Sequence, residues 1–153
     1  MTGRLRALGL LAAVLTLLAL LVAPPAGARV AGCGPSDAVG ARIQLLFVHG
    51  FVSSARTWAK AVKGFCSDTV YATAFDYSAV NSNWVSDPAI GPALATEILR
   101  LADASQRGGG PGKVLLVGHS MGGLAIRCAA DGRCNGGLGA DPGRPSPVAE
   151  AIG

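Results

Sequence analysis

The most informative stretch of this chain is Lys113-Val114-Leu115-Leu116-Val117-Gly118-His119-Ser120-Met121-Gly122. An apolar run rich in branched side chains enters a Gly-x-Ser-x-Gly sequence, and an apolar helical pattern follows it. This order is typical of a strand, a sharp turn and a helix, with the serine hydroxyl held outward at the turn. Ser120 is therefore a candidate nucleophile for acyl transfer, provided that a histidine accepts its proton.

The glycines that flank the serine have a physical role, because a side chain at Gly118 or Gly122 would collide with neighbouring backbone in a tight turn. The motif alone is weak evidence, since 22 of the 153 residues are glycine. Its context makes it more specific. A strand pattern precedes it, a helix pattern follows it, and the pair His49-Gly50 ends an earlier apolar run.

Hydrophobic periodicity predicts further strands and helices before the turn. The apolar run 43–48 suits a strand that is buried on both faces, as in a parallel sheet. Gly64 is expected to end the first helix, and Asp76 to fix the turn after the second strand. The predicted elements are a strand at 43–48, a helix at 55–63, a strand at 69–77, a helix at 93–106, a strand ending at Gly118 and a helix at 121–130.

Alternating strands and helices predict the α/β class, with a parallel sheet and covering helices joined by right-handed crossovers. About three core strands are visible, all within residues 43–131, so the predicted sheet is incomplete. Residues 29–42 form a Gly/Ala-rich lead-in. Residues 136–147 contain four glycines and three prolines, which predicts that 132–153 is a disordered tail without a core element.

The first 28 residues have the pattern of a secretory signal peptide. Arg4 and Arg6 precede an apolar run, two prolines follow it, and Ala26-Gly27-Ala28 is a small-residue cleavage site. The run is short for a transmembrane helix, which needs about 20 residues. We therefore expect a secreted protein, with an uncleaved membrane anchor as the alternative.

Four cysteines make an even set, which suits two disulfides in an exported chain. Three pairings are possible, of which we favour Cys33–Cys66 and Cys128–Cys134. Zinc binding is less favoured, because the sequence has no C-x-x-C pair. The segment Val30-Ala31-Gly32-Cys33 also resembles a bacterial lipobox, so a lipoprotein anchored through Cys33 is a further alternative to secretion.

The charge of the chain argues against one class of partner. The formal net charge is +4, but without Arg4 and Arg6 the remaining 11 basic and 9 acidic residues leave +2. No run of like charges remains, so neither nucleic acid nor an anionic surface is indicated. The 125 residues after the signal peptide suffice for one small domain, and no oligomeric state is predicted.

Three segments carry a family resemblance: Val48-His49-Gly50-Phe51, Phe75-Asp76-Tyr77 and Gly118-His119-Ser120-Met121-Gly122. Together they resemble the N-terminal part of the α/β-hydrolase superfamily, and more narrowly its secreted bacterial esterases and lipases. The resemblance implies that Ser120 attacks an ester carbonyl and forms an acyl-enzyme. It also implies an oxyanion hole made by two backbone N–H groups. These N–H groups belong to Phe51 and Met121. The surrounding motif residues that support the site are His49, Gly50, Gly118, His119 and Gly122.

In this family an Asp or Glu and then a His follow the serine along the chain. The sequence contains only His49 and His119, and neither follows Ser120. His49 is expected to hold the oxyanion loop, and a neighbour such as His119 does not naturally face the serine hydroxyl. The resemblance therefore implies a serine esterase or lipase whose chain ends before its catalytic acid and base.

The sequence is compatible with other functions as well. The chain could be a non-catalytic exported or lipid-anchored protein that keeps the fold, or an acyltransferase or thioesterase that uses the same turn. The expected partner is a small-molecule ester or a lipid, with contact at a lipid interface and no nucleic acid. No metal cluster or phosphate-binding glycine loop is visible, so no cofactor is expected.

Overall fold

The computed structural model describes residues 32–33, 40–131, 138 and 146–152. Its elements follow one another in the alternating order that the periodicity predicts. They are β1 (Ile43–Val48), the 3-10 turn η2 (Ala55–Trp58), α2 (Ala59–Phe65), β2 (Val70–Phe75), the 3-10 turn η3 (Ser78–Val80), α3 (Gly91–Arg107), β3 (Val114–Gly118), α4 (Met121–Ala130) and β4 (Val148–Ile152).

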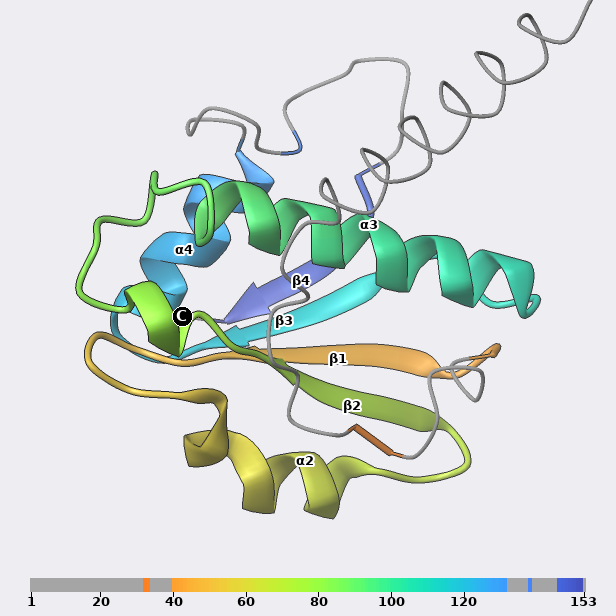
Figure 1. Ribbon diagram of the computed structural model, residues 1–153. Helices are drawn as coiled ribbons and strands as arrows, with labels where there is room; N and C mark the ends of the chain where they lie inside the picture. The colour runs from red at the N-terminus through yellow and green to blue at the C-terminus, as the bar shows by residue number, and fades with distance from the viewer. Residues whose placement is uncertain (1–31, 34–39, 132–137, 139–145, 153) are drawn as a thin grey trace, which may run out of the picture.

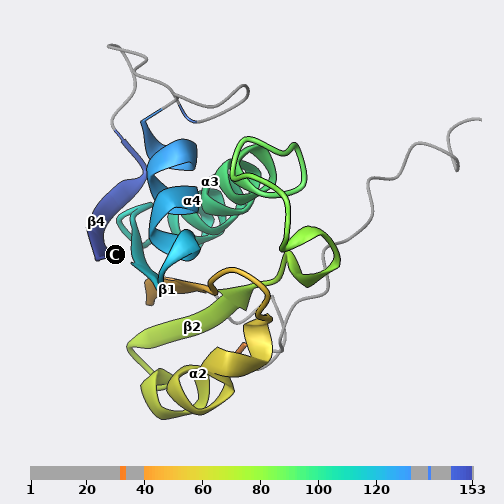
Figure 2. The ribbon, with the colours of Figure 1, turned by 90° about the vertical axis from the view of Figure 1, so that its left-hand side faces the viewer.

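The strands form one parallel sheet in the order β2-β1-β3-β4. The helix α2 lies on one face of this sheet, and α3 and α4 lie together on the other (Figure 1). Seen from the end, the sheet separates the two helical layers (Figure 2). The fold is therefore the α/β class expected from the sequence, with a sheet that represents only part of that fold.

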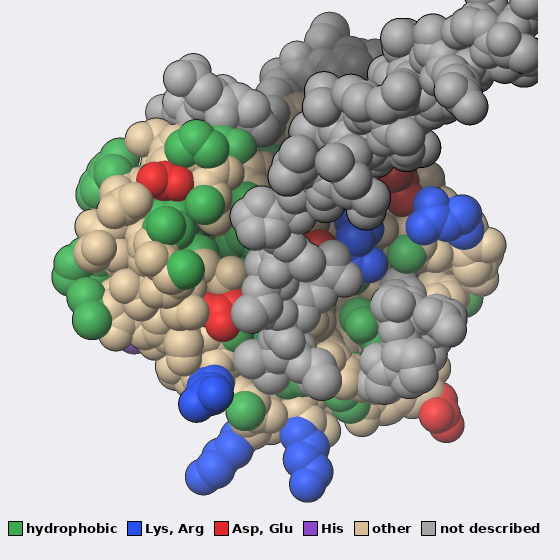
Figure 3. Space-filling view, in the orientation of Figure 1, with side chains coloured by type: hydrophobic (Ala, Val, Ile, Leu, Met, Phe, Trp, Pro, Cys, Tyr) green, Lys and Arg blue, Asp and Glu red, His purple; other side chains and the backbone are tan. Residues whose placement is uncertain are grey.

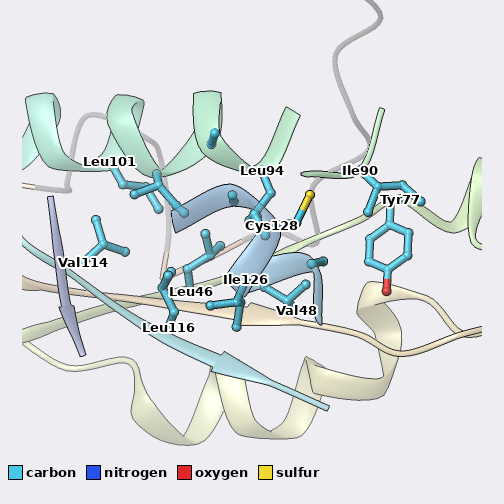
Figure 4. Close-up of a cluster of buried hydrophobic side chains, with 14 of the residues drawn as sticks. Leu46, Val48, Tyr77, Ile90, Leu94, Leu101, Val114, Leu116, Ile126 and Cys128 are labelled. Atoms are coloured by element: carbon cyan, nitrogen blue, oxygen red, sulfur yellow. The ribbon is translucent and has the colours of Figure 1, made fainter. Parts of the chain in front are cut away.

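The central strand β1 is buried on both faces because every residue from Leu45 to Val48 is apolar. Leu46 and Val48 pack with residues of α3 and α4 (Figure 4). Leu45 and Phe47 point to the other side and pack with residues from η2 and α2. This two-sided burial is the usual arrangement in parallel sheets.

The structure corrects one prediction about the tail. Residues 148–152 form β4, which pairs with β3 through Val114–Val148 and Val117–Ile152, although the Gly/Pro-rich composition predicts a disordered tail over 132–153. The dense Gly and Pro residues end at Pro147, and the strand that follows depends on a distant partner. The rest of the predicted tail, residues 132–137, 139–145 and 153, lies outside the described residues.

Two helix boundaries also differ from the prediction. Gly64 does not end α2, which continues through Phe65 and closes with a hydrogen bond from Cys66 N–H to Val62 O. The next helix, α3, begins at Gly91 rather than at 93, because Pro92 is well placed in the first turn of a helix. Such end effects depend on local geometry more than on periodicity.

The predicted disulfide Cys33–Cys66 is present, with 5.2 Å between the two Cα atoms. Because the Cys33 sulfur is bonded to Cys66, it is not available for lipid attachment, which contradicts the lipoprotein alternative. The second predicted pair includes Cys134, and the predicted signal peptide covers residues 1–28; both lie outside the described residues. Among the described helices, none is long and apolar enough to cross a membrane.

Candidate active site

The sheet topology places the serine turn where the connections after two neighbouring strands diverge to opposite faces of the sheet. The neighbouring strands β1 and β3 are paired up to Val48 and Gly118. After β1 the chain turns to α2 on one face, whereas after β3 it turns to α4 on the other (Figure 1). Ligands of open α/β sheets bind at the carboxyl ends of strands where the connections diverge in this way.

Ser120 lies at this point as the N-terminal flanking residue of α4. Its φ of 55° and ψ of −123° are unusual for a residue other than glycine. The residue is exposed at the carboxyl ends of the strands. The turn is closed by hydrogen bonds from Gly122 N–H to His119 O and from Gly123 N–H to Ser120 O, both 2.9 Å.

The flanking glycines are required by close backbone packing. A Cβ at Gly118 would lie 2.6 Å from Gly123 N. A Cβ at Gly122 would lie 2.7 Å from His49 O and closer still to Val48 O. Both distances are shorter than any side chain tolerates, so the start of α4 can approach the end of β1 only without side chains here.

Two backbone donors on or next to the serine turn, the N–H groups of Met121 and Phe51, have no acceptor among the described residues. Gly50 packs against the turn, because a Cβ there would lie 3.2 Å from the Ser120 Cβ; Phe51 is the next residue along the chain. In the part of the chain that the structure describes, no hydrogen bond has the N–H of Phe51 or of Met121 as its donor. Free N–H groups beside a nucleophilic serine are the elements of an oxyanion hole.

His49 is fully buried and both of its ring nitrogens have partners. Nδ1 donates to Gly50 O at 2.9 Å, so Nε2 is the acceptor for the Tyr77 backbone N–H at 3.1 Å. The imidazole stacks on the Tyr77 ring with 3.9 Å between centroids. A histidine engaged in this way has no free nitrogen for the proton of Ser120, and its contacts hold the loop after β1.

Asp76 and Tyr77 complete this network from the end of β2. Asp76 Oδ1 lies 3.2 Å from His49 Nε2 and accepts the backbone N–H of Ser78 at 3.0 Å, so it holds the turn as the sequence suggests. The Tyr77 hydroxyl donates to His49 O, and burial raises the pKa of Tyr77 to about 12. Tyr77 belongs to the segment Phe75-Asp76-Tyr77 that carries the family resemblance, but the sequence assigned it no role of its own.

Other candidate groups lie apart from the serine or are exposed. His119 is exposed on the turn. Of the three acidic residues after Ser120, Asp131 ends α4 and Glu150 is exposed on β4, whereas Asp141 lies outside the described residues. Within those residues no group of three or more metal-ligating side chains is found.

The sequence pattern of the Alpha/beta hydrolase family matches residues 45–152. The chain therefore belongs to this family. No curated protein sequence matches it.

Solved structures agree with this fold. The lipase BlEst2 of Bacillus licheniformis in its propeptide form is 23% identical with a TM-score of 0.52, over 70% of this chain and 22% of that one. An esterase of the planctomycete Thermogutta terrifontis, Est2 with butyrate bound, is 20% identical with a TM-score of 0.51, over 67% and 38%. Identities this low show the fold alone. The chain spans less than half the length of either structure.

Proposed function

We propose that this chain carries the nucleophile part of a serine carboxylester hydrolase that acts through an acyl-enzyme on Ser120. The observation that carries the proposal is the exposed, strained Ser120 beside two backbone N–H groups that have no acceptor in the part of the chain that the structure describes. The esterase and lipase among the similar folds support this class of reaction. The Cys33–Cys66 disulfide is compatible with the proposed secretion.

In the proposed reaction the Ser120 hydroxyl oxygen attacks the ester carbonyl and its proton passes to a base. The carbonyl oxygen becomes an oxyanion, which accepts hydrogen bonds from Phe51 and Met121. The oxyanion then collapses, the alcohol leaves with the proton, and water later releases the acid from Ser120. Loss of one oxyanion donor typically costs about 3–4 kcal/mol of barrier.

The base is the component that the described residues do not supply, because His49 is fully engaged and His119 is the immediate neighbour of Ser120. We propose that the base belongs to a part of the fold beyond these residues. The lack of a base among the described residues also favours a second candidate function, that of a non-catalytic protein which keeps the serine turn only as part of its fold.

Labelling with a fluorophosphonate, with and without added imidazole as a soluble base, distinguishes the two candidates. We expect labelling at Ser120, stimulated by imidazole, and its loss in Ser120→Ala but not in Ser82→Ala, an exposed serine outside the turn. A folded chain that stays unlabelled under both conditions would favour the non-catalytic candidate. Parallel assays with oxyesters and thioesters would separate an esterase from a thioesterase.

A further inference from the structure

The helical segment after β1 presents a row of basic side chains. Arg56, Lys60 and Lys63 are spaced i, i+4 and i+7, which places them on one face of the continuous η2–α2 segment. All three are exposed, and basic side chains project from the surface where α2 lies (Figure 3). Residues 43–67 contain no Asp or Glu.

These charges are not neutralised by neighbours within the described residues. The ion pair found there joins Arg100 to Glu97. Asp76 lies beside the ring of His49, whose Nε2 accepts a hydrogen bond from the Tyr77 N–H. The inner face of η2–α2 is apolar and packs on the sheet through Ala55, Trp58 and Val62. Fold stability therefore explains the inner face of this segment, but it does not explain the basic residues on the outer face.

Apolar side chains stand in water beside the same segment. Phe51 is 57 % exposed and Val52 is 68 % exposed, and both lie in the loop that leads into η2. Val52 has a φ of 49°, which is rare for a β-branched residue, and its N–H donates to Asn81 O at 3.3 Å. The loop is thus held with its apolar side chains outward rather than folded onto the core.

We propose that the surface formed by Arg56, Lys60, Lys63, Phe51 and Val52, called here the basic–apolar face, docks on an anionic lipid surface, although the absence of a run of like charges in the sequence did not indicate one. Lys and Arg side chains are attracted to acidic head groups, and adjacent apolar side chains enter the boundary between head groups and acyl chains. A nucleic acid would pair with the cations but would leave Phe51 and Val52 in water, so a lipid surface fits both sets of residues.

The basic–apolar face adjoins the serine turn, because Gly50 packs on Ser120 and directly precedes Phe51. Docking there would bring the carboxyl ends of the strands, where Ser120 lies, close to the lipid. Any link to lipid hydrolysis rests on the function proposed above. Docking itself needs no turnover and is expected to persist in Ser120→Ala.

The test measures how strongly the full chain and its variants bind to two kinds of vesicle. One contains phosphatidylcholine with anionic phosphatidylglycerol, and the other contains phosphatidylcholine alone. The triple variant Arg56→Gln/Lys60→Gln/Lys63→Gln should lower the partition coefficient on anionic vesicles by on the order of 100-fold. A matched control, Arg107→Gln/Lys113→Gln/Arg127→Gln, removes the same charge from elements outside η2–α2 and should retain binding. Added salt should weaken the binding of the unaltered chain.

A second variant tests the apolar half of the surface. Asparagine adopts a positive φ more readily than valine, so Val52→Asn should leave the backbone conformation unchanged. Because it removes an apolar side chain, it should also weaken vesicle binding. Amide hydrogen exchange should show protection of residues 51–65 on anionic vesicles, which localises the contact even if another segment of the chain also binds lipid. The proposal is overturned if both triple variants bind equally, if residues 51–65 gain no protection, or if the chain binds RNA or heparin but not anionic vesicles.

Discussion

At the scale of single residues, Ser120 combines an exposed hydroxyl with an unfavourable backbone conformation. Its φ and ψ of 55° and −123° lie outside the regions that residues with a Cβ ordinarily occupy. Such a conformation costs about 1–3 kcal/mol and persists only where surrounding structure enforces it. Here the enforcing contacts are the packing of Gly122 against the end of β1 and the closed turn at the start of α4.

This strain predicts a difference between two substitutions of the same serine. Ser120→Gly should raise the free energy of unfolding by about 1 kcal/mol, because relief of strain exceeds the extra backbone entropy of glycine. Ser120→Ala keeps the Cβ and should give no such gain. Urea denaturation of the two variants measures the difference, and equal stabilities would show that the turn is not strained.

At the scale of elements, the ends of β1 and β2 are joined by the contacts of His49 with Asp76 and Tyr77. The hydrogen bond from the Tyr77 hydroxyl to His49 O and the stacking of the two rings fix the direction in which the chain leaves β1. The loop that starts there contains Phe51, whose N–H is the proposed oxyanion donor. The network thus connects the packing of the sheet edge to the geometry of the site.

Tyr77→Phe tests this connection through pH. Burial raises the pKa of Tyr77 to about 12, above its ordinary value of 10.0. The neutral hydroxyl therefore stabilises the fold fully below pH 10, and this stability is lost as pH rises towards 12. We expect Tyr77→Phe to lower the free energy of unfolding by about 1 kcal/mol at pH 8, because the hydrogen bond is lost. Between pH 8 and pH 11, however, the variant should lose less stability than the unaltered chain.

Urea unfolding at the two pH values makes the comparison, with Tyr71→Phe as a matched control. That variant retains Tyr77 and should therefore lose stability between pH 8 and pH 11 as the unaltered chain does. If Tyr77→Phe and the unaltered chain lose the same amount, Tyr77 is not the source of the alkaline instability.

At the scale of the whole molecule, the sheet is covered unevenly. On the α2 side, Leu115 and Val117 of β3 are only partly buried, and Ile152, paired with Val117, is 59 % exposed. Among the described residues β4 has no partner on its outer edge. Parallel strands are usually buried on both faces, and an uncovered edge is a site for pairing with other chains.

The exposed edge predicts concentration-dependent self-association. A lysine at position 152 places a charge on this edge, which is how natural edge strands avoid pairing. We expect Ile152→Lys to reduce association in sedimentation experiments without lowering the thermal midpoint, since Ile152 contributes little to the core. A chain that stays monomeric at all concentrations before substitution would contradict the prediction.

Features with a local cause could be predicted from the sequence. The apolar run of β1, the helical stripe of α3 and the turn at Ser120 all depend on residues within a few positions of one another. The Cys33–Cys66 pair has no such local cause, since its residues lie 33 positions apart; it was favoured among three possible pairings and is present. Helix ends were less well predicted, as at Gly64, because they depend on capping contacts rather than on periodicity.

The sequence alone thus determined the α/β class, the order of elements and the serine that belongs at the turn, because each is encoded by short-range patterns. Only the tertiary structure decided that 148–152 joins the sheet, that His49 is locked by Tyr77 and that Phe51 and Val52 are exposed. These arrangements depend on contacts between distant residues or on side-chain exposure. Sequence spacing encodes neither, since both follow from how the layers pack around β1.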